Sequence, residues 1–152
     1  MLPLQPPPRD LSGKISRHNH PEILDEDTII RRISPHHLVP DGQGRSVISS
    51  MAYQESSEDG EGMSIDIEKL ILEDGKNPSD VLISSDWIGA VQFDAGFLRS
   101  KELDVGYDPI EEGVNINPYH GQIWGKFPKS VKRALQKAAE WYIEAEGVLL
   151  RR

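Results

Sequence analysis

The pattern of polar and apolar residues predicts β-structure in the first third of the chain. Residues 28–33 (TIIRRI) are rich in β-branched side chains and are bounded by Pro35, which is typical of a strand. Residues 41–44 (DGQG) have turn composition, because glycine adopts the positive φ that tight hairpins need. Residues 45–53 then alternate between two faces. Together with residues 38–40 they predict a β-hairpin.

Helix signals alternate with strand signals in the middle of the chain. Ser64, Asn77 and Asp94 are residue types that cap helix starts, and Pro78 suits a first helical position. These signals predict short helices over residues 65–73, 78–83 and 95–101. Strands are predicted over residues 87–93, 103–107 and 120–124.

The most regular pattern covers residues 129–146. Its apolar residues follow steps of three and four, as on the buried side of an amphipathic helix: Val131, Ala134, Leu135, Ala138, Trp141, Tyr142 and Ala145. Pro128 suits the start of a helix, and Gly147 suits the position after its end. We therefore predict one long C-terminal helix over residues 129–146.

Strands that precede and separate helices are typical of an α+β domain. We expect a small, mainly antiparallel sheet packed by the long C-terminal amphipathic helix and by two or three short helices. Residues 1–22 are rich in proline and are predicted to form a flexible N-terminal arm. Residues 23–152 are predicted to form a single α+β domain, which is long enough to bury a core without covalent cross-links.

Composition restricts the chemistry and the compartment. The 152 residues include no cysteine, which excludes disulfides, a thiolate zinc site and a cysteine nucleophile. The first residues lack the basic and apolar regions of a signal peptide, and no apolar run has membrane-spanning length. These features predict a cytoplasmic protein that does not contact a membrane.

Charge is distributed unevenly along the chain. The net charge is −8, but residues 61–113 carry a net −9 and residues 114–152 a net +4. The basic side chains gather at the start of the predicted C-terminal helix: Lys126, Lys129, Lys132, Arg133 and Lys137. Glu140, Glu144 and Glu146 lie at its predicted end. The helix macrodipole disfavours this order, so we expect the cations to have an anionic partner.

Two partners remain open for these cations, the acidic middle of the same chain or another molecule. The leading functional hypothesis is a non-enzymatic accessory or interaction module. It would bind a protein partner or an anionic ligand through the basic region, with the N-terminal arm as a second contact. Nucleic acid is the disfavoured partner, because the chain as a whole is acidic.

The alternative hypothesis is a small phosphate- or nucleotide-handling enzyme of the transferase type. Arginine forks suit phosphate groups, and histidine suits proton transfer. The residues that would carry this activity are Arg32, His37, Ser49 and His120, with Arg31, Arg45 and a glutamate from residues 111–112 as further members. Cross-strand polar pairing on a solvated sheet face is the competing structural explanation.

The five histidines have no spacing that indicates a metal site. His18 and His20 lie with Glu22 in the predicted arm, where ligands would be poorly preorganised. A second site would require the strands near residues 36 and 120 to be neighbours. It would then combine His36 or His37 with His120 and with a carboxylate from Asp41 or Glu112. We predict neither a metal nor a cofactor.

Overall fold

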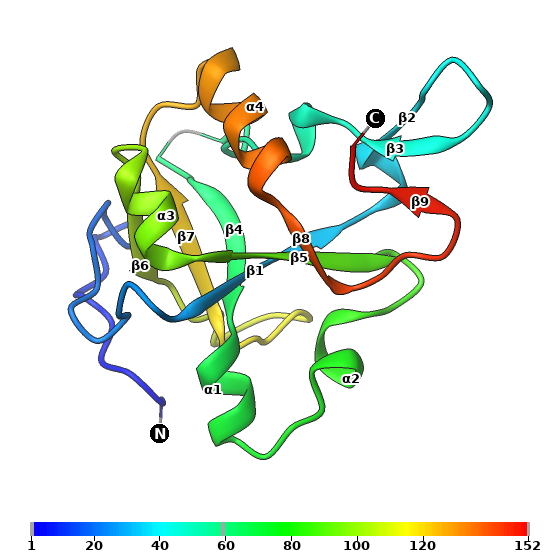
Figure 1. The fold of residues 1–152 in the computed structure, drawn as a ribbon. Helices are drawn as coiled ribbons and strands as arrows, with labels where there is room; N and C mark the ends of the chain where they lie inside the picture. Colours follow the sequence, from blue (N-terminus) through cyan, green and yellow to red (C-terminus); the bar gives the residue numbers. More distant parts are fainter. Residues whose placement is uncertain (1, 59, 152) are drawn as a thin grey trace.

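The computed structural model describes residues 2–58 and 60–151, which form two β-sheets and four α-helices (Figure 1). The larger sheet has six strands in the order β6-β7-β4-β1-β5-β8, and each neighbouring pair is antiparallel. Its strands are β1 (Thr28–Ile33), β4 (Met63–Ile67), β5 (Gly89–Asp94), β6 (Asp104–Tyr107), β7 (His120–Trp124) and β8 (Glu140–Ile143). The predicted α+β fold with a mainly antiparallel sheet is confirmed.

A smaller sheet contains the predicted hairpin. Its strands are β2 (Leu38–Pro40), β3 (Ser46–Ile48) and β9 (Val148–Leu149). β2 and β3 are antiparallel, and the Asp41 side chain accepts hydrogen bonds from the backbone N–H groups of Gln43 and Arg45 at 2.8 and 3.1 Å. This Asx-type turn explains why the loop was recognisable from its composition.

The helices are short, and their starts agree with the sequence signals to different degrees. They are α1 (Glu68–Glu73), α2 (Pro78–Leu82), α3 (Ala95–Ser100) and α4 (Lys129–Ala138), with 3-10 turns η1 (Pro35–His37) and η2 (Ser50–Ala52). Asn77 caps α2 as expected, since its side chain accepts from the N–H of Ser79. Ser64 lies inside β4, so α1 begins three residues later than predicted.

The predicted long C-terminal helix is wrong. α4 ends at Ala138, and Ala139 has extended dihedral angles of φ −58° and ψ 134°. Residues Glu140–Ile143 form β8, which pairs with β5 at the edge of the sheet. The aromatic residues after Glu140 favour a strand as readily as a helix face, and β5 offers them a backbone partner. Gly147, with φ 75°, leads into β9 instead of ending a helix.

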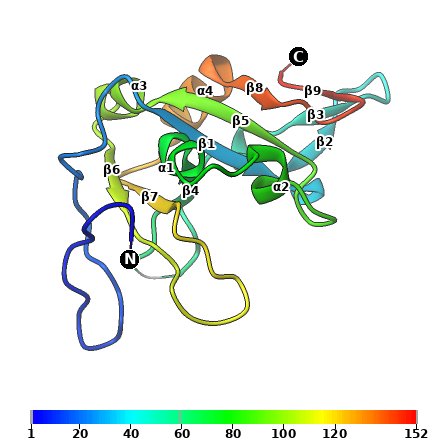
Figure 2. The same ribbon diagram turned by 90° about the horizontal axis from the view of Figure 1, so that it is seen from below.

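The two faces of the larger sheet differ in polarity. On the core face, the isoleucines of β1, β4 and β7 are almost completely buried: Ile29, Ile65, Ile67 and Ile123. This face packs against α3 and α4, which contribute Leu98 and Leu135 to the core. The other face carries Asp66 and His120, which are paired across β4 and β7. Figure 2 shows α3 and α4 on one side of the sheet and the N-terminal segment with the 108–119 loop on the other.

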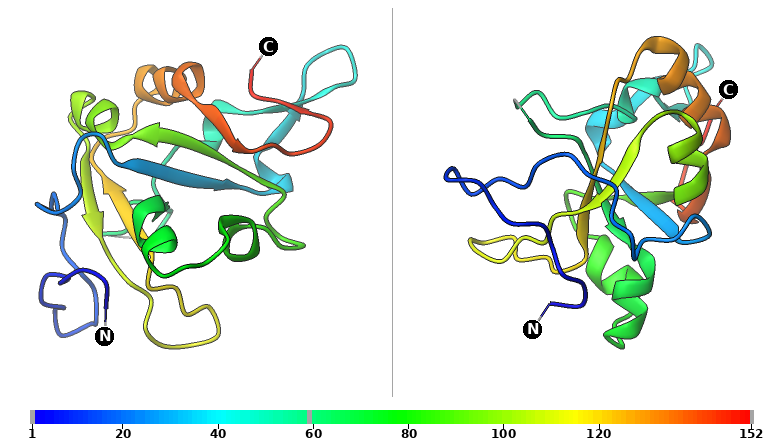
Figure 3. Two further views of the ribbon diagram at one scale, coloured as in Figure 1. Left: turned by 60° about the horizontal axis from the view of Figure 1, so that its bottom comes forward. Right: turned by 90° about the vertical axis from the view of Figure 1, so that its left-hand side faces the viewer.

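Residues 2–22 lie beside β6 without joining either sheet (Figure 3). His18 Nε2 accepts from the N–H of Tyr107 at 3.1 Å, and Asn19 Oδ1 accepts from the N–H of Val105 at 2.8 Å. Ile15 is buried. The segment therefore has specific contacts with the domain, and its flexibility stays a prediction. No helix within residues 2–58 and 60–151 has the length and apolar character to cross a membrane.

Candidate functional site

Two neighbouring cavities open beside the point where β1 diverges from β4. The strands are paired only at Ile29↔Ile67 and Ile30↔Asp66, and beyond this point they separate. A cavity of about 1010 Å³ extends from this gap toward the 110–120 loop and α2. A cavity of about 490 Å³ extends toward η1 and η2. Arg31, His36 and Ser64 line both cavities, so these three side chains form a shared wall.

A buried ion pair lies in the larger cavity. Arg32 donates from Nε and Nη2 to the two carboxylate oxygens of Asp66, at 2.8 and 3.1 Å. Asn117 Nδ2 donates to the same carboxylate at 2.7 Å. The Asp66 side chain is only 4% exposed, so its charge is compensated by these three donors instead of by water.

His120 is held on the same strand face, directly opposite Asp66 in the β4–β7 register. Its Nδ1 lies 2.7 Å from the carbonyl oxygen of Asp108, which accepts a hydrogen bond from the protonated nitrogen. This contact assigns the Nδ1–H tautomer to a neutral ring and leaves the lone pair on Nε2. A histidine oriented in this way can accept a proton from a ligand in the cavity.

The other two members of the predicted enzyme set line the smaller cavity and have structural contacts. His37 Nδ1 accepts from the N–H of Ser34 at 3.0 Å. Burial, together with the nearby charge of Arg31 and with His36, lowers the pKa of His37 to about 4, so the ring is neutral at pH 7. Ser49 accepts from the N–H of Met51 and caps η2. Both side chains therefore have a role in the local backbone structure.

The structure thus divides the predicted enzyme residues between two cavities. Arg32 and His120 line the larger one, and His37 and Ser49 line the smaller one. Arg45 lines neither of these cavities; it pairs with Asp41 in the β2–β3 hairpin at 2.6 Å. Asp41 is therefore no partner for a histidine. Glu111 and Glu112 line a third cavity together with His120.

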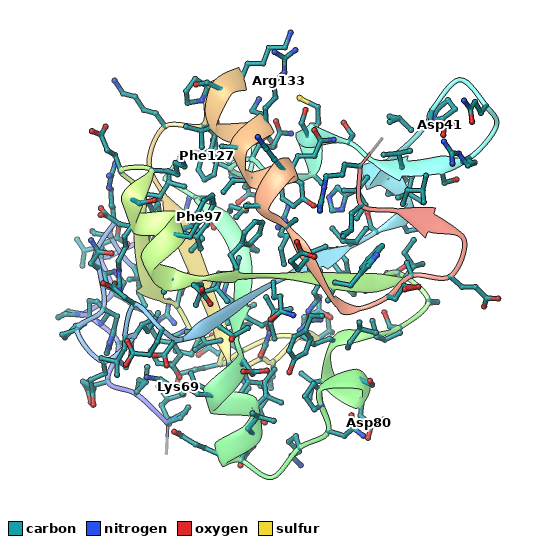
Figure 4. The ribbon with its side chains drawn as sticks, in the orientation of Figure 1. Asp41, Lys69, Asp80, Phe97, Phe127 and Arg133 are labelled. Carbon is teal, nitrogen blue, oxygen red and sulfur yellow. The ribbon has the colours of Figure 1, made fainter. Side chains whose placement is uncertain are left out.

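The basic residues near α4 form a separate surface, which we call the basic face: Lys126, Lys129, Lys132, Arg133 and Lys137. Three of them, at positions 129, 133 and 137, are exposed and follow one another at intervals of four. Arg133 points away from the protein in Figure 4. Within residues 2–58 and 60–151, no carboxylate forms an ion pair with any of the five; Lys132 Nζ lies 3.8 Å from Met51 Sδ.

Because α4 ends at Ala138, its charged side chains lie differently relative to the helix ends than the sequence predicted. The glutamates that follow lie outside the helix, and Lys137 is in its last turn, where the macrodipole favours a cation. No acidic residue and no capping side chain stands in the first turn. The cations at the start of the helix are therefore the ones that the macrodipole disfavours. No described acidic residue from the middle of the chain forms an ion pair with them.

The histidines of the N-terminal segment have structural contacts as well. His18 packs against the ring of Trp124, with 5.2 Å between centroids. His20 is buried, with Nε2 placed 2.8 Å from the carbonyl oxygen of Gln5. In the described part of the chain, no group of three or more histidine, aspartate or glutamate side chains could hold a metal ion.

Sequence reasoning did not identify Asp66 or Asn117 as members of the site. One signal was available for Asp66, because a single carboxylate interrupts the apolar alternation of residues 63–67 (MSIDI). Asn117 is separated from Asp66 by 51 positions, and only the fold brings them together. No protein-family model matches the chain, and comparisons with curated proteins and with solved structures gave no match either.

Proposed function

We propose that this chain is a non-enzymatic interaction module that binds an acidic segment of a partner protein through the basic face of α4. The observation that carries the proposal is the absence of ion pairs at all five cations within the described residues, whereas most arginines elsewhere are paired. Arg9, Arg17, Arg32, Arg45, Arg99 and Arg151 each form an ion pair.

The charge of the rest of the molecule supports a single docking orientation. The chain carries a net −8, so an acidic partner is repelled over most of the surface and attracted at the basic face. The same acidity disfavours nucleic acid. Its phosphates extend well beyond one helix and would be repelled by the acidic surface around it. An acidic segment of about the length of α4 matches the exposed side chains at positions 129, 133 and 137.

The test reverses two exposed charges, Lys129→Glu with Arg133→Glu. The control variant, Lys14→Glu with Lys76→Glu, makes the same change in net charge at exposed positions outside the basic face. Binding is measured by fluorescence anisotropy with a labelled peptide of twelve alternating glutamates and serines at low salt. We expect about tenfold weaker binding for the α4 variant and unchanged binding for the control, since exposed interfacial charges contribute roughly 0.5–1 kcal/mol each.

Thermal melts should show that both variants stay folded, because exposed surface substitutions change stability by about 0.5 kcal/mol or less. Equal binding of the peptide by the wild type and the α4 variant contradicts the proposal. Tighter binding of a twelve-nucleotide single-stranded DNA than of the peptide also contradicts it.

A further inference from the structure

Arg31 is a cation without a carboxylate partner in the wall between the two cavities. Its Nε donates to the carbonyl oxygen of Ala52 at 3.1 Å, and its Nη1 donates to the carbonyl oxygen of Ser64 at 2.8 Å. The neighbouring Arg32 has the carboxylate of Asp66, but among the described residues no acidic side chain pairs with Arg31. The backbone carbonyls orient its guanidinium without neutralising its charge.

The surroundings of Arg31 make an uncompensated charge unfavourable. Burial lowers the pKa of Arg31 to about 10, against an ordinary value of 12.5, although the negative charge of Asp66 nearby opposes this decrease. The side chain remains protonated at pH 7. Removing an unpaired cation from water is costly unless an anion or other polar groups replace the water. An anion entering either cavity at this wall would supply that compensation.

The gap between β1 and β4 explains why Arg31 has this position. Arg31 follows the last residue of β1 that is paired with β4, and its guanidinium reaches across the gap to the backbone of β4. His36 and Ser64 stand beside it in the same shared wall, and neither side chain donates or accepts a hydrogen bond within the described residues. A guanidinium, an imidazole and a hydroxyl together form a donor set suited to phosphate oxygens.

The larger cavity continues from this wall into a region of mixed polarity. Val81, Trp87, Ile110 and Tyr119 also line this cavity. Its volume of about 1010 Å³ is at the upper end of the range for small-ligand sites, so it has room for an organic group attached to the anion. The other acidic side chain that lines it, Asp86, is exposed, and the charge of Asp66 is already paired with Arg32.

We propose that the shared wall of Arg31, His36 and Ser64 binds the phosphate of a small phosphate monoester, whose organic group extends along Trp87 and Tyr119. This site is distinct from the basic face of α4. Arg31 supplies the fixed charge, and Ser64 and His36 supply adjacent donors. His120 lines the same cavity, opposite Asp66 on the neighbouring strand.

The experiment uses phenyl phosphate and inorganic phosphate as probes at pH 7. The Nε–H signals of the arginines are followed by nuclear magnetic resonance while each probe is added to the wild-type chain. We expect a saturable shift of the Arg31 signal and none at Arg45, which lines neither cavity and is paired with Asp41. Phenyl phosphate should bind at least threefold more tightly than inorganic phosphate, because its ring contacts the apolar part of the cavity.

Variants test the assignment to Arg31. Arg31→Gln should weaken phenyl phosphate binding at least tenfold, and the matched control Arg45→Gln should leave it unchanged. If Arg31→Gln does not fold, the wild-type titration still decides. Absence of a saturable Arg31 shift overturns the proposal, and equal affinity for the two probes overturns the placement of the organic group. The Lys129→Glu with Arg133→Glu variant should bind phenyl phosphate normally, which separates this site from the basic face.

Discussion

The pairing of Asp66 with Arg32 should be among the most stability-sensitive features of the sheet. The Asp66 side chain is 4% exposed and that of Arg32 is 22% exposed. Asp66→Ala would leave the Arg32 guanidinium without its carboxylate, beside Arg31, which also has none, and would remove the acceptor of Asn117. Breaking a buried pair on one side costs about 3–5 kcal/mol. For a chain of this length that corresponds to a decrease in Tm of roughly 6–20 °C.

A double-mutant cycle measures whether this cost arises from the pair itself. Arg32→Met leaves a buried carboxylate with one amide donor, and Arg32→Met combined with Asp66→Ala removes both charges. We expect the double variant to be less destabilised than the sum of the two single variants by about 2 kcal/mol or more. Urea unfolding followed by tryptophan fluorescence provides the free energies of unfolding.

The comparison needs an exposed ion pair as a control. Glu140→Ala removes a partner of Arg151 at 3.6 Å, with side chains that are 65% and 39% exposed, and should cost less than about 0.5 kcal/mol. The reasoning is refuted if the Arg32 and Asp66 substitutions add within about 0.5 kcal/mol, because independent sites behave in that way.

Two further predictions concern the core side of the cavities. The pKa of His37 is about 4 in the folded chain and ordinary in the unfolded chain, so the unfolded state binds more protons between pH 6.5 and 4, and stability should fall as the pH decreases through that window. We expect a loss of roughly 1–2 kcal/mol after solvent screening, measured from urea midpoints, and a flatter profile for His37→Asn. The Tyr53 hydroxyl is buried without a hydrogen-bond partner among the described residues. Tyr53→Phe should leave stability unchanged or raise it by up to about 1 kcal/mol, and a loss of more than 1 kcal/mol in the same assay would show that the hydroxyl has a partner.

The parts of the fold that sequence could predict are those with local causes. Asp41 and its glycines specify the β2–β3 turn through contacts within four residues, and Asn77 specifies the start of α2 through a contact two residues away. The strand over residues 28–33 was predicted within its observed bounds, because its β-branched residues and the following proline act locally.

The structural features that were predicted wrongly depend on residues that are distant in the sequence. Trp141 continues the helical spacing of α4, yet it lies in β8 because β5, some 50 residues earlier, offers backbone hydrogen-bonding groups. The candidate site follows the same rule. Arg32 and His120 were singled out by residue type, whereas Asp66 became visible only through contacts across 34 and 51 positions. Sequence patterns carried no information about the gap between β1 and β4, which positions Arg31.

β8, whose residues were predicted to be helical, also covers an edge of the larger sheet that could otherwise pair with another chain. Four of the six residues of β5 are buried, and β8 is the outer neighbour of this strand. Without residues 140–143, β5 would present unpaired N–H and C=O groups next to apolar side chains, which is a template for pairing with another chain. The exposed edge instead belongs to β8, a short strand that begins with Glu140 and is followed by Glu144, and negative charges at an edge discourage such pairing. We therefore expect Glu140 and Glu144 to oppose the pairing of β8 with a strand of another chain.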